Sequence, residues 1–221
     1  MIVPDNNFIQ KFRETYGAMS VCEMIFLANC AFDAPEGTYL ELGSHKGKSS
    51  SAIALFVDEK SKFHLVEPEF KDSAWIKEVA TLVNSVRPNI NIVLIPDYST
   101  NVIPFYNQLA FVFVDSGNHQ DGLPDKEVKM LEDRMKDGGI IVFHDYNSQF
   151  YEVTEAYEYL ISTGKYKPIL PDWSRIVKYV DENNLEQGNN TWHHTDKKNP
   201  CYIGALKRVD NENNEELYFR V

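Results

Sequence analysis

Residues 41–50, ELGSHKGKSS, have the composition of a turn that holds a phosphate or a nucleoside. A Walker loop needs four residues between its first glycine and the Gly-Lys pair, so that successive backbone N–H groups surround a phosphate. Gly43 and Gly47 enclose only three residues, so this loop is one residue short. The dinucleotide fingerprint also fails, because a single residue separates its first two glycines. The segment therefore indicates an acidic residue that ends a strand, followed by two glycines before a helix.

A second set of reactive residue types follows two apolar runs further along the chain. Asp115 ends one run, His144 and Asp145 end another, and His119 lies shortly after Asp115. Parallel strands present their carboxyl ends at one edge of a sheet, so we expect these side chains to lie close together. Two carboxylates that close are costly unless a cation, a proton or a positive partner lies between them. The sequence therefore predicts either a divalent ion or a protonated His144 in this gap.

The elements that must position these residues alternate between two kinds of segment. Five apolar runs are nearly continuous in hydrophobicity, as strands buried on both faces require: residues 38–43, 62–68, 90–96, 109–115 and 139–145. Helical segments are predicted at residues 47–57, 72–86, 125–136 and 150–162. Ser20 and Glu23 form a capping box that predicts one more helix before the first strand. This alternation predicts an α/β fold, a doubly wound and mostly parallel sheet, with a last strand at 201–209.

The length of 221 residues fits one domain with a single core. We expect an N-terminal helical segment at residues 1–34, and the run at 181–200 predicts a long polar loop without periodicity. The three cysteines are an odd number at spacings that suit neither a disulfide framework nor a zinc site, which favours a reducing compartment.

The charge and the absence of apolar segments limit the partners. A net charge of −11 argues against nucleic acid, whose phosphates are bound by clustered Lys and Arg. The opening residues have neither a basic start followed by an apolar stretch nor a cleavage site, so we expect no secretory leader, and no run approaches the roughly 20 apolar residues of a membrane-spanning helix. We therefore expect a cytoplasmic protein that acts on a small molecule, without membrane association, and the sequence leaves a homo-oligomer open.

The glycine motif at 41–50 resembles the first motif of class I S-adenosylmethionine-dependent methyltransferases. Residues 91–102, 111–122 and 135–146 are similar to later motifs of the macrocin O-methyltransferase and cephalosporin hydroxylase type group. This chain departs from the group at one motif. Where the group has Asp-Gly-Asp-His, residues 115–119 read Asp-Ser-Gly-Asn-His, with one residue added and Asn118 in place of the second acid. The resemblance implies a Rossmann-like methyltransferase fold with seven strands.

The same resemblance implies which residues bind S-adenosylmethionine. Gly43 lets the backbone approach the ligand without a Cβ, so Gly43→Arg is expected to abolish binding while leaving the fold intact. Glu41 is expected to face the amino end of the ligand, and Glu67 to accept hydrogen bonds from both ribose hydroxyls. The complete expected set of cofactor contacts is Glu41, Gly43, Ser44, Gly47, Ser49, Glu67, Asp97, Tyr98, Ser99 and Asp115.

The expected catalytic residues are His119, His144 and Asp145. His119 is the candidate general base, because an unperturbed imidazole pKa near 6.5 suits removal of a hydroxyl proton, although it could equally hydrogen-bond to adenine or the loop. In some relatives, carboxylates at the positions of Asp115 and Asp145 bind magnesium, and His144 is the third expected ligand here. Manganese or iron tolerates an imidazole better than magnesium does.

The sequence thus predicts transfer of a methyl group from S-adenosylmethionine to a hydroxyl of a small molecule, such as a sugar or another polyhydroxylated metabolite. The expected cofactors are S-adenosylmethionine and a divalent ion, magnesium or manganese. Two alternatives remain: metal-free N-methylation of a small molecule, and a non-catalytic module that only binds S-adenosylmethionine. Tyr146, Trp173 and Trp192 could line an acceptor pocket or cover the core, and solvent exposure is expected for His193 and His194.

Overall fold

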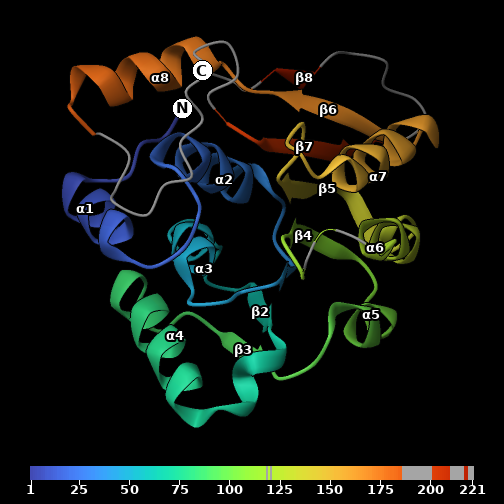
Figure 1. Ribbon diagram of the computed structural model, residues 1–221, viewed down its shortest axis with the longest axis horizontal. Helices are drawn as coiled ribbons and strands as arrows, with labels where there is room; N and C mark the ends of the chain where they lie inside the picture. The colour runs from blue at the N-terminus through green and yellow to red at the C-terminus, as the bar shows by residue number, and fades with distance from the viewer. Residues whose placement is uncertain (118, 120, 186–200, 210–216, 219–221) are drawn as a thin grey trace.

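A single sheet divides the protein into two helical layers. The computed structural model describes residues 1–117, 119, 121–185, 201–209 and 217–218. The strands lie in the order β3-β2-β1-β4-β5-β7-β6-β8, which can be followed from the bottom to the top of Figure 1. The strand bounds are β1 Thr38–Leu42, β2 Lys62–Val66, β3 Ile92–Ile95, β4 Leu109–Val114, β5 Met135–His144, β6 Tyr166–Leu170, β7 Ile203–Arg208 and β8 Leu217–Tyr218.

Strands β1 to β5 pair in parallel, whereas β7 is antiparallel to both of its neighbours, β5 and β6. The predicted mostly parallel, doubly wound sheet of seven strands is confirmed, and the two-residue β8 adds a parallel pairing at the edge of β6. Because β1 lies between β2 and β4, the chain changes direction across the sheet at the carboxyl end of β1. Ligands of doubly wound proteins bind outside such a switch point.

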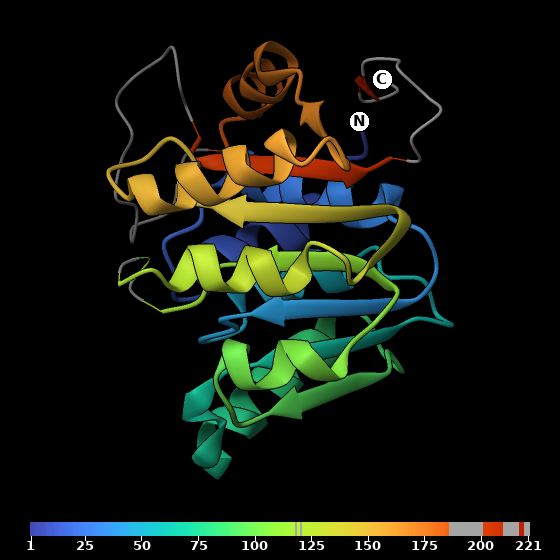
Figure 2. The same ribbon diagram turned by 90° about the vertical axis from the view of Figure 1, so that its right-hand side faces the viewer.

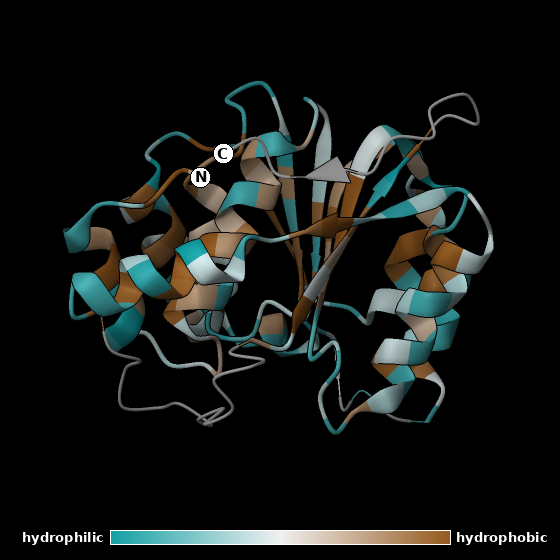
Figure 3. Cartoon of the chain, turned by 90° about the horizontal axis from the view of Figure 1, so that it is seen from above, coloured by the Kyte–Doolittle hydropathy of each residue, from teal (hydrophilic) through white to brown (hydrophobic). Residues whose placement is uncertain are grey.

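Helices cover both faces of the sheet, as the views in Figures 2 and 3 show. Successive strand residues point to opposite faces, so Tyr39 contributes to one core cluster and Leu40 to the other. The first cluster packs under α1, α2, α3, α4 and α8, and the second under α5, α6 and α7. The helix bounds are α1 Asn6–Glu14, α2 Val21–Asp33, α3 Lys48–Ala54, α4 Ser73–Val86, α5 Ser99–Val102, α6 Leu123–Leu131, α7 Tyr151–Ser162 and α8 Trp173–Glu182.

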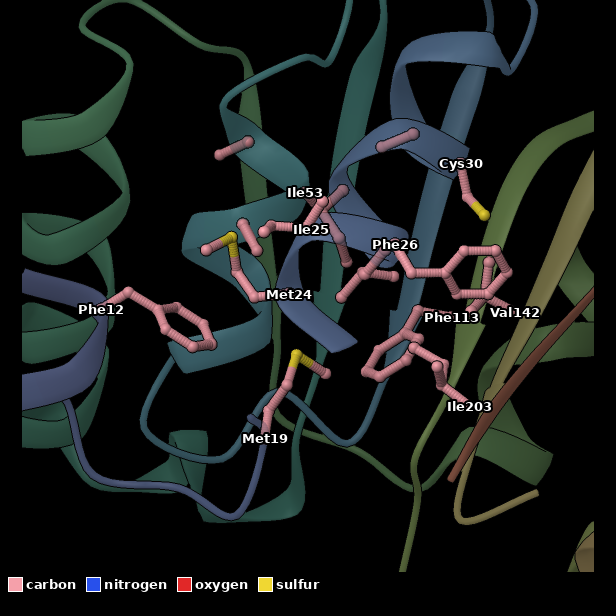
Figure 4. Packing of buried hydrophobic residues seen from close by; sticks show 14 of the residues in the cluster. Phe12, Met19, Met24, Ile25, Phe26, Cys30, Ile53, Phe113, Val142 and Ile203 are labelled. Atoms are coloured by element: carbon pink, nitrogen blue, oxygen red, sulfur yellow. The ribbon is translucent and has the colours of Figure 1, made fainter. Parts of the chain in front are cut away.

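Helix α2 is apolar on nearly all sides and lies inside the first layer rather than on its surface. Figure 4 shows Met24, Ile25 and Phe26 of this helix among side chains of α1, α3 and the sheet. A helix that is hydrophobic all round is expected in a protein interior. The predicted capping box starts it: Ser20 Oγ accepts from the Glu23 backbone N–H at 3.2 Å, and Glu23 Oε2 accepts from the Ser20 backbone N–H at 2.8 Å.

Three segments differ from the sequence-based expectations. The helix expected at 125–136 ends at Leu131, because the carbonyl of Arg134 already accepts the backbone N–H of Leu109 and β5 begins at Met135. Strand β6 was not expected, since it contains Pro168, a residue usually excluded from strand interiors. Helix α8 was not expected either, and because it extends to Glu182 it includes the first two residues of the expected polar loop. Residues 186–200 of that loop lie outside the described part of the chain.

Two short 3-10 helices, at Pro68–Lys71 and Ile103–Phe105, complete the described elements. Among the residues that the structure describes, no helix is both long and apolar enough to cross a membrane.

Candidate functional site

The candidate site lies at the carboxyl ends of β1, β2, β4 and β5. Its first component is the turn from Gly43 to Gly47, which joins β1 to α3. Gly43 has a φ of +92°, and its backbone N–H donates to the Val66 carbonyl of β2 at 2.9 Å. Gly47 has a φ of +81° at the start of α3, a backbone conformation that glycine adopts without strain. The turn therefore depends on both glycines.

Gly43 also fixes the distance between β1 and β4. A Cβ atom at this position would lie 2.2 Å from the backbone oxygen of Asp115 and 3.0 Å from the Cα of Ser116. These are backbone atoms, which cannot move aside as a flexible side chain could. The expectation that Gly43→Arg leaves the fold intact is therefore wrong, because any side chain here pushes β1 and β4 apart.

Glu41 is fully buried beneath the turn. Its carboxylate accepts hydrogen bonds from the hydroxyls of Ser49 and Ser50 in the first turn of α3. Burial raises the pKa of Glu41 to about 7, with the serine hydrogen bonds acting in the opposite direction. In this structure Glu41 and Ser49 hold α3 against β1, and their expected contacts with a cofactor stay predictions.

The other expected cofactor residues follow β2 and β3. Glu67 is half-buried, and its carboxylate accepts the backbone N–H groups of His45 at 2.9 Å and Glu69 at 3.2 Å. Asp97 accepts the backbone N–H of Tyr98 and the side-chain amide of Asn101, both at 2.7 Å. These two carboxylates therefore order the turns in which they lie. Of the remaining expected contacts, Tyr98 is 60% exposed, whereas Ser44 and Ser99 are buried.

The second component is a cluster of two carboxylates and two imidazoles after β4 and β5. His119 Nε2 lies 3.2 Å from Asp115 Oδ1 and 3.1 Å from Asp145 Oδ2. His144 Nδ1 lies 3.3 and 3.2 Å from the same two oxygens. The prediction that these four residues meet at the edge of the sheet agrees with the structure, although their catalytic and ligand roles stay predictions.

The charges in the cluster depend on one another. Burial acts to lower the pKa of His119, but hydrogen bonds and charge interactions with Asp115 and Asp145 outweigh it and raise the pKa to about 9. The pKa of His144 is raised well above its ordinary value for the same reasons, and the pKa values of both aspartates are lowered despite burial. A histidine that is protonated at neutral pH cannot accept a proton. The structure therefore does not favour His119 as the general base of the metal-free protein.

The donor atoms of the cluster fit a divalent metal ion. Ligand atoms about 2.1 Å from one ion lie about 3.0 Å apart at right angles and about 3.4 Å apart at tetrahedral angles. The four N···O distances, from 3.1 to 3.3 Å, fall in this interval. Asp115, His119 and Asp145 each present a ligand atom within 4.8 Å of the others, and His144 is not part of this group. His119 thus takes the place in the group that the sequence assigned to His144, while His144 Nδ1 lies 3.3 and 3.2 Å from the two carboxylate oxygens as a candidate fourth ligand.

Sequence reasoning missed Glu23, a buried carboxylate beside the cluster, and Lys48, a buried ammonium group that interacts with Glu23. Glu23 was identified only as a helix cap, yet its Oε2 lies 3.9 Å from Nε2 of His144. Lys48 of α3 is also buried, and its Nζ donates to the Gly17 carbonyl at 3.0 Å. No local pattern could have found the Glu23 contact, because 121 positions separate it from His144 and the fold alone brings them together.

Glu127 on α6 is a third missed residue. Its buried carboxylate accepts a hydrogen bond from Ser116, the residue after Asp115, and burial raises its pKa to about 7. Glu127 thereby ties the loop after β4 to α6.

Most of the aromatic side chains proposed for an acceptor pocket serve the core instead. Tyr146 packs on Tyr157 with ring centroids 4.1 Å apart, and Trp173 packs on Phe26 at 5.2 Å. Phe150, which was not predicted, lies 5.3 Å from the His119 ring and so flanks the cluster. The predictions for Asn118, Trp192, His193 and His194 fall on residues outside those that the structure describes.

Comparisons with known proteins support the assignment of the domain. A sequence profile of the family described as "Methyltransferase domain" matches residues 40–146, which contain the glycine turn and all four residues of the cluster. A search of curated proteins with this sequence finds no match. Residues 40–146 are thus similar to a methyltransferase domain, whereas nothing confirms the more specific macrocin and cephalosporin hydroxylase type group.

Solved structures share the fold at low sequence identity. The O-methyltransferase TomG from Streptomyces achromogenes, involved in tomaymycin synthesis and solved with SAM, is 12% identical, with a TM-score of 0.61 over 95% of this chain and 93% of its own. An O-methyltransferase from Bacillus cereus, solved with SAH, is 11% identical, with a TM-score of 0.61 over 95% and 94%. An rRNA methylase from Streptococcus thermophilus is 16% identical, with a TM-score of 0.53 over 85% and 94%. At these identities the likeness shows the fold alone.

Proposed function

We propose that this protein transfers a methyl group from S-adenosylmethionine to a hydroxyl of a small molecule, with a divalent ion at the cluster of Asp115, His119, His144 and Asp145. One observation carries the proposal: the glycine turn and the charged cluster share one edge of the sheet and touch where Gly43 meets the backbone of Asp115. A donor site and an acceptor site are thus adjacent, as a displacement between two bound molecules requires.

The turn suits the donor. S-adenosylmethionine supplies a methyl group on a sulfonium centre, and its transfer depends mainly on the alignment of donor and acceptor. Gly43 and Gly47 leave the backbone open to close approach, and the half-buried Glu67 carboxylate is ordered by two backbone N–H groups. A carboxylate has about four acceptor positions, so Glu67 retains capacity for ribose hydroxyls. Tyr98, exposed after β3, lies on the turn where an adenine is expected.

The cluster suits a hydroxyl acceptor. In the metal-free protein, His119 and His144 hold protons and the aspartates have lowered pKa values, so none of these four groups is suited to accept a proton at neutral pH. A divalent ion supplies a positive charge that makes a coordinated hydroxyl easier to deprotonate. Asp115 and Asp145 would hold such an ion by one carboxylate oxygen each, and the two histidines by Nε2 and Nδ1.

Further carboxylates surround the cluster. Glu23 Oε2 lies 3.9 Å from His144 Nε2, and the buried Glu41 and Glu127 interact electrostatically with Asp115. This excess of carboxylates favours positive charge in the cluster, which a divalent ion or protonated imidazoles would supply. An acceptor of nucleic acid type is disfavoured by the net charge of −11.

A label-transfer experiment tests the proposal. The protein, supplied with manganese, is incubated with methyl-labelled S-adenosylmethionine and a small-molecule extract, and labelled products are separated and identified. We expect label in an O-methyl ether, and less of it after chelation or with Glu67→Ala. Label in an N-methyl product that resists chelation would favour the metal-free alternative. Binding of S-adenosylmethionine without any transfer would favour a non-catalytic module, and label in RNA would overturn the small-molecule acceptor.

A further inference from the structure

The two ring nitrogens of His144 have different surroundings. Nδ1 faces the carboxylates of Asp115 and Asp145 at 3.3 and 3.2 Å. Nε2 is buried and has no hydrogen-bond partner within the described residues, and Glu23 Oε2 lies 3.9 Å from it. Buried polar atoms almost always have a partner, so the position of Nε2 requires an explanation.

Glu23 is held in place independently of His144. Its Oε2 accepts the Ser20 backbone N–H at 2.8 Å, and its Oε1 accepts the Tyr202 backbone N–H at 2.9 Å. These contacts come from the start of α2 and from the residue before β7, and the side chain is only 3% exposed. The carboxylate is therefore a fixed, buried acceptor beside the ring.

A neutral imidazole carries its proton on one nitrogen and a lone pair on the other. A proton on Nε2 would lie on the side of the ring where Glu23 Oε2 is 3.9 Å away, and would leave the Nδ1 lone pair on the side of the cluster. Histidines that bind metals almost always donate their other N–H to a carboxylate or a carbonyl, which fixes both the tautomer and the ring orientation. The pair of Glu23 and His144 has the residue types and the order of such an arrangement.

We propose that Asp115, His119, His144 and Asp145 bind a first-row transition-metal dication in preference to magnesium, and that Glu23 is the positioning residue that fixes the tautomer of His144. Two imidazole nitrogens beside two carboxylate oxygens suit manganese, iron or zinc, whereas magnesium prefers oxygen ligands and retains water. This inference rests on the metal site of the proposed function and names the class of ion and the residue behind its ligand.

Glu23→Gln tests the positioning role, with Ser20→Ala as the matched control. The glutamine keeps the length of the side chain and one carbonyl oxygen, while Ser20→Ala removes the other half of the capping box and leaves the carboxylate. Chelator-stripped proteins are titrated calorimetrically with Mn²⁺ and Zn²⁺. We expect Glu23→Gln to weaken binding about 10- to 100-fold, as for other residues behind metal ligands, and Ser20→Ala to leave it within about twofold. Equal effects of the two substitutions would overturn the role of Glu23.

A double substitution shows whether Glu23 acts through His144. In the His144→Asn variant, the shorter side chain cannot reach Glu23, but it keeps a polar atom near the position of Nδ1. In this background, Glu23→Gln should have no further effect on metal affinity, because the interaction that it removes is already absent. A loss of the same size as in the wild-type background would overturn the proposed connection.

Two measurements on the wild-type protein do not depend on how the variants fold. In zinc-loaded protein labelled with ¹⁵N-histidine, nuclear magnetic resonance should show His144 as the neutral tautomer with its proton on Nε2; a proton on Nδ1 would overturn the inference. Mg²⁺ should bind at least about 100-fold more weakly than Mn²⁺ or Zn²⁺, and equal affinity would overturn the class of ion.

Failure of the metal-site inference and failure of the proposed methyl transfer give different experimental results. If no divalent ion binds, this inference and the metal of the proposed function both fail, whereas the donor site is judged separately by S-adenosylhomocysteine binding. If ions bind as predicted but no methyl transfer occurs with any acceptor, the metal site and the role of Glu23 stand and the proposed function fails.

Discussion

The site has a donor half at the ends of β1 to β3 and an acceptor half at the ends of β4 and β5. The two halves differ in which groups form hydrogen bonds or ion pairs with their carboxylates. On the side of β1 to β3, Glu67 and Asp97 accept backbone N–H groups, and Glu41 accepts serine hydroxyls. On the side of β4 and β5, Asp115 and Asp145 face two imidazoles at 3.1 to 3.3 Å. The first half is thus ordered by neutral groups of the chain, while the second depends on charges that a proton or an ion must supply.

The comparison predicts that each half can be lost without the other. Neutral hydrogen bonds within the turns should preserve the donor half at any metal concentration, while the acceptor half should respond to protons and ions. Gly43 is the exception, because the two halves touch there.

Gly43→Ala should damage both halves at once. Its Cβ would lie 2.2 Å from the Asp115 backbone oxygen, and alanine is strained at a φ of +92°. We expect a loss of about 3 kcal/mol or more in the free energy of unfolding, from strain and overpacking together. Chemical denaturation measures it, with Gly164→Ala as a control at a positive φ where a Cβ would meet no atom within 4 Å. Equal stability of the two variants would show that β1 and β4 can separate easily.

Glu41→Gln should change how stability depends on pH. The pKa of Glu41 is raised from 4.5 to about 7 in the folded protein, so its stabilising contribution is fully present below pH 4.5 and is lost as the pH rises through 7. Glutamine does not titrate, and the hydroxyls of Ser49 and Ser50 can donate to its oxygen and accept from its amide. The stability of the variant relative to wild type should therefore increase by about 2 to 3 kcal/mol between pH 4.5 and pH 8. Denaturation at several pH values measures this, and a constant difference would contradict the buried, titrating carboxylate.

Asp145→Asn should remove the ion from the acceptor half and leave the donor half intact. Asparagine tolerates the φ of +60° at this position, so the backbone should not change. We expect manganese affinity to fall by about 100-fold or more, since the loss of a ligand should exceed that of a residue behind one. Asp125→Asn, an exposed site paired with Lys129, is the control. An unchanged manganese affinity would show that the two carboxylates do not form a metal site.

Glu67→Ala should have the opposite effect: it should weaken ligand binding at the donor half and leave metal binding at the acceptor half unchanged. Loss of hydrogen bonds to a charged group should weaken S-adenosylhomocysteine binding by about 1.5 to 3 kcal/mol, while manganese affinity stays the same. Glu69→Ala, an exposed glutamate two residues further on, is the matched control. A change of less than about twofold in S-adenosylhomocysteine affinity would place the ribose elsewhere.

The sequence was most informative where the fold repeats a simple pattern. Continuous apolar runs located β1 to β5, although β3 at the edge of the sheet is only partly buried, and the capping box located the start of α2. The meeting of Asp115 with His144 and Asp145 followed from the rule that parallel strands end at one edge. These predictions depended on local composition and on one general property of parallel sheets.

Other features of the site depend on contacts that no local pattern encodes. Sequence alone could not show that Glu23, a helix cap, lies behind His144, or that Gly43 touches the backbone of Asp115. It also assigned His119 an ordinary pKa, whereas the two carboxylates beside it raise that pKa to about 9. Strand β6 was missed because its pairing with β7 outweighs the low strand propensity of Pro168.

Calorimetric titration with S-adenosylhomocysteine, first with chelator and then with manganese, tests whether the glycine turn forms a donor site that needs no metal ion. We expect one S-adenosylhomocysteine to bind per chain, with an affinity that chelation and Asp145→Asn leave unchanged and Glu67→Ala reduces about 10- to 100-fold. Absence of S-adenosylhomocysteine binding by the folded wild-type protein, with and without manganese, would contradict it.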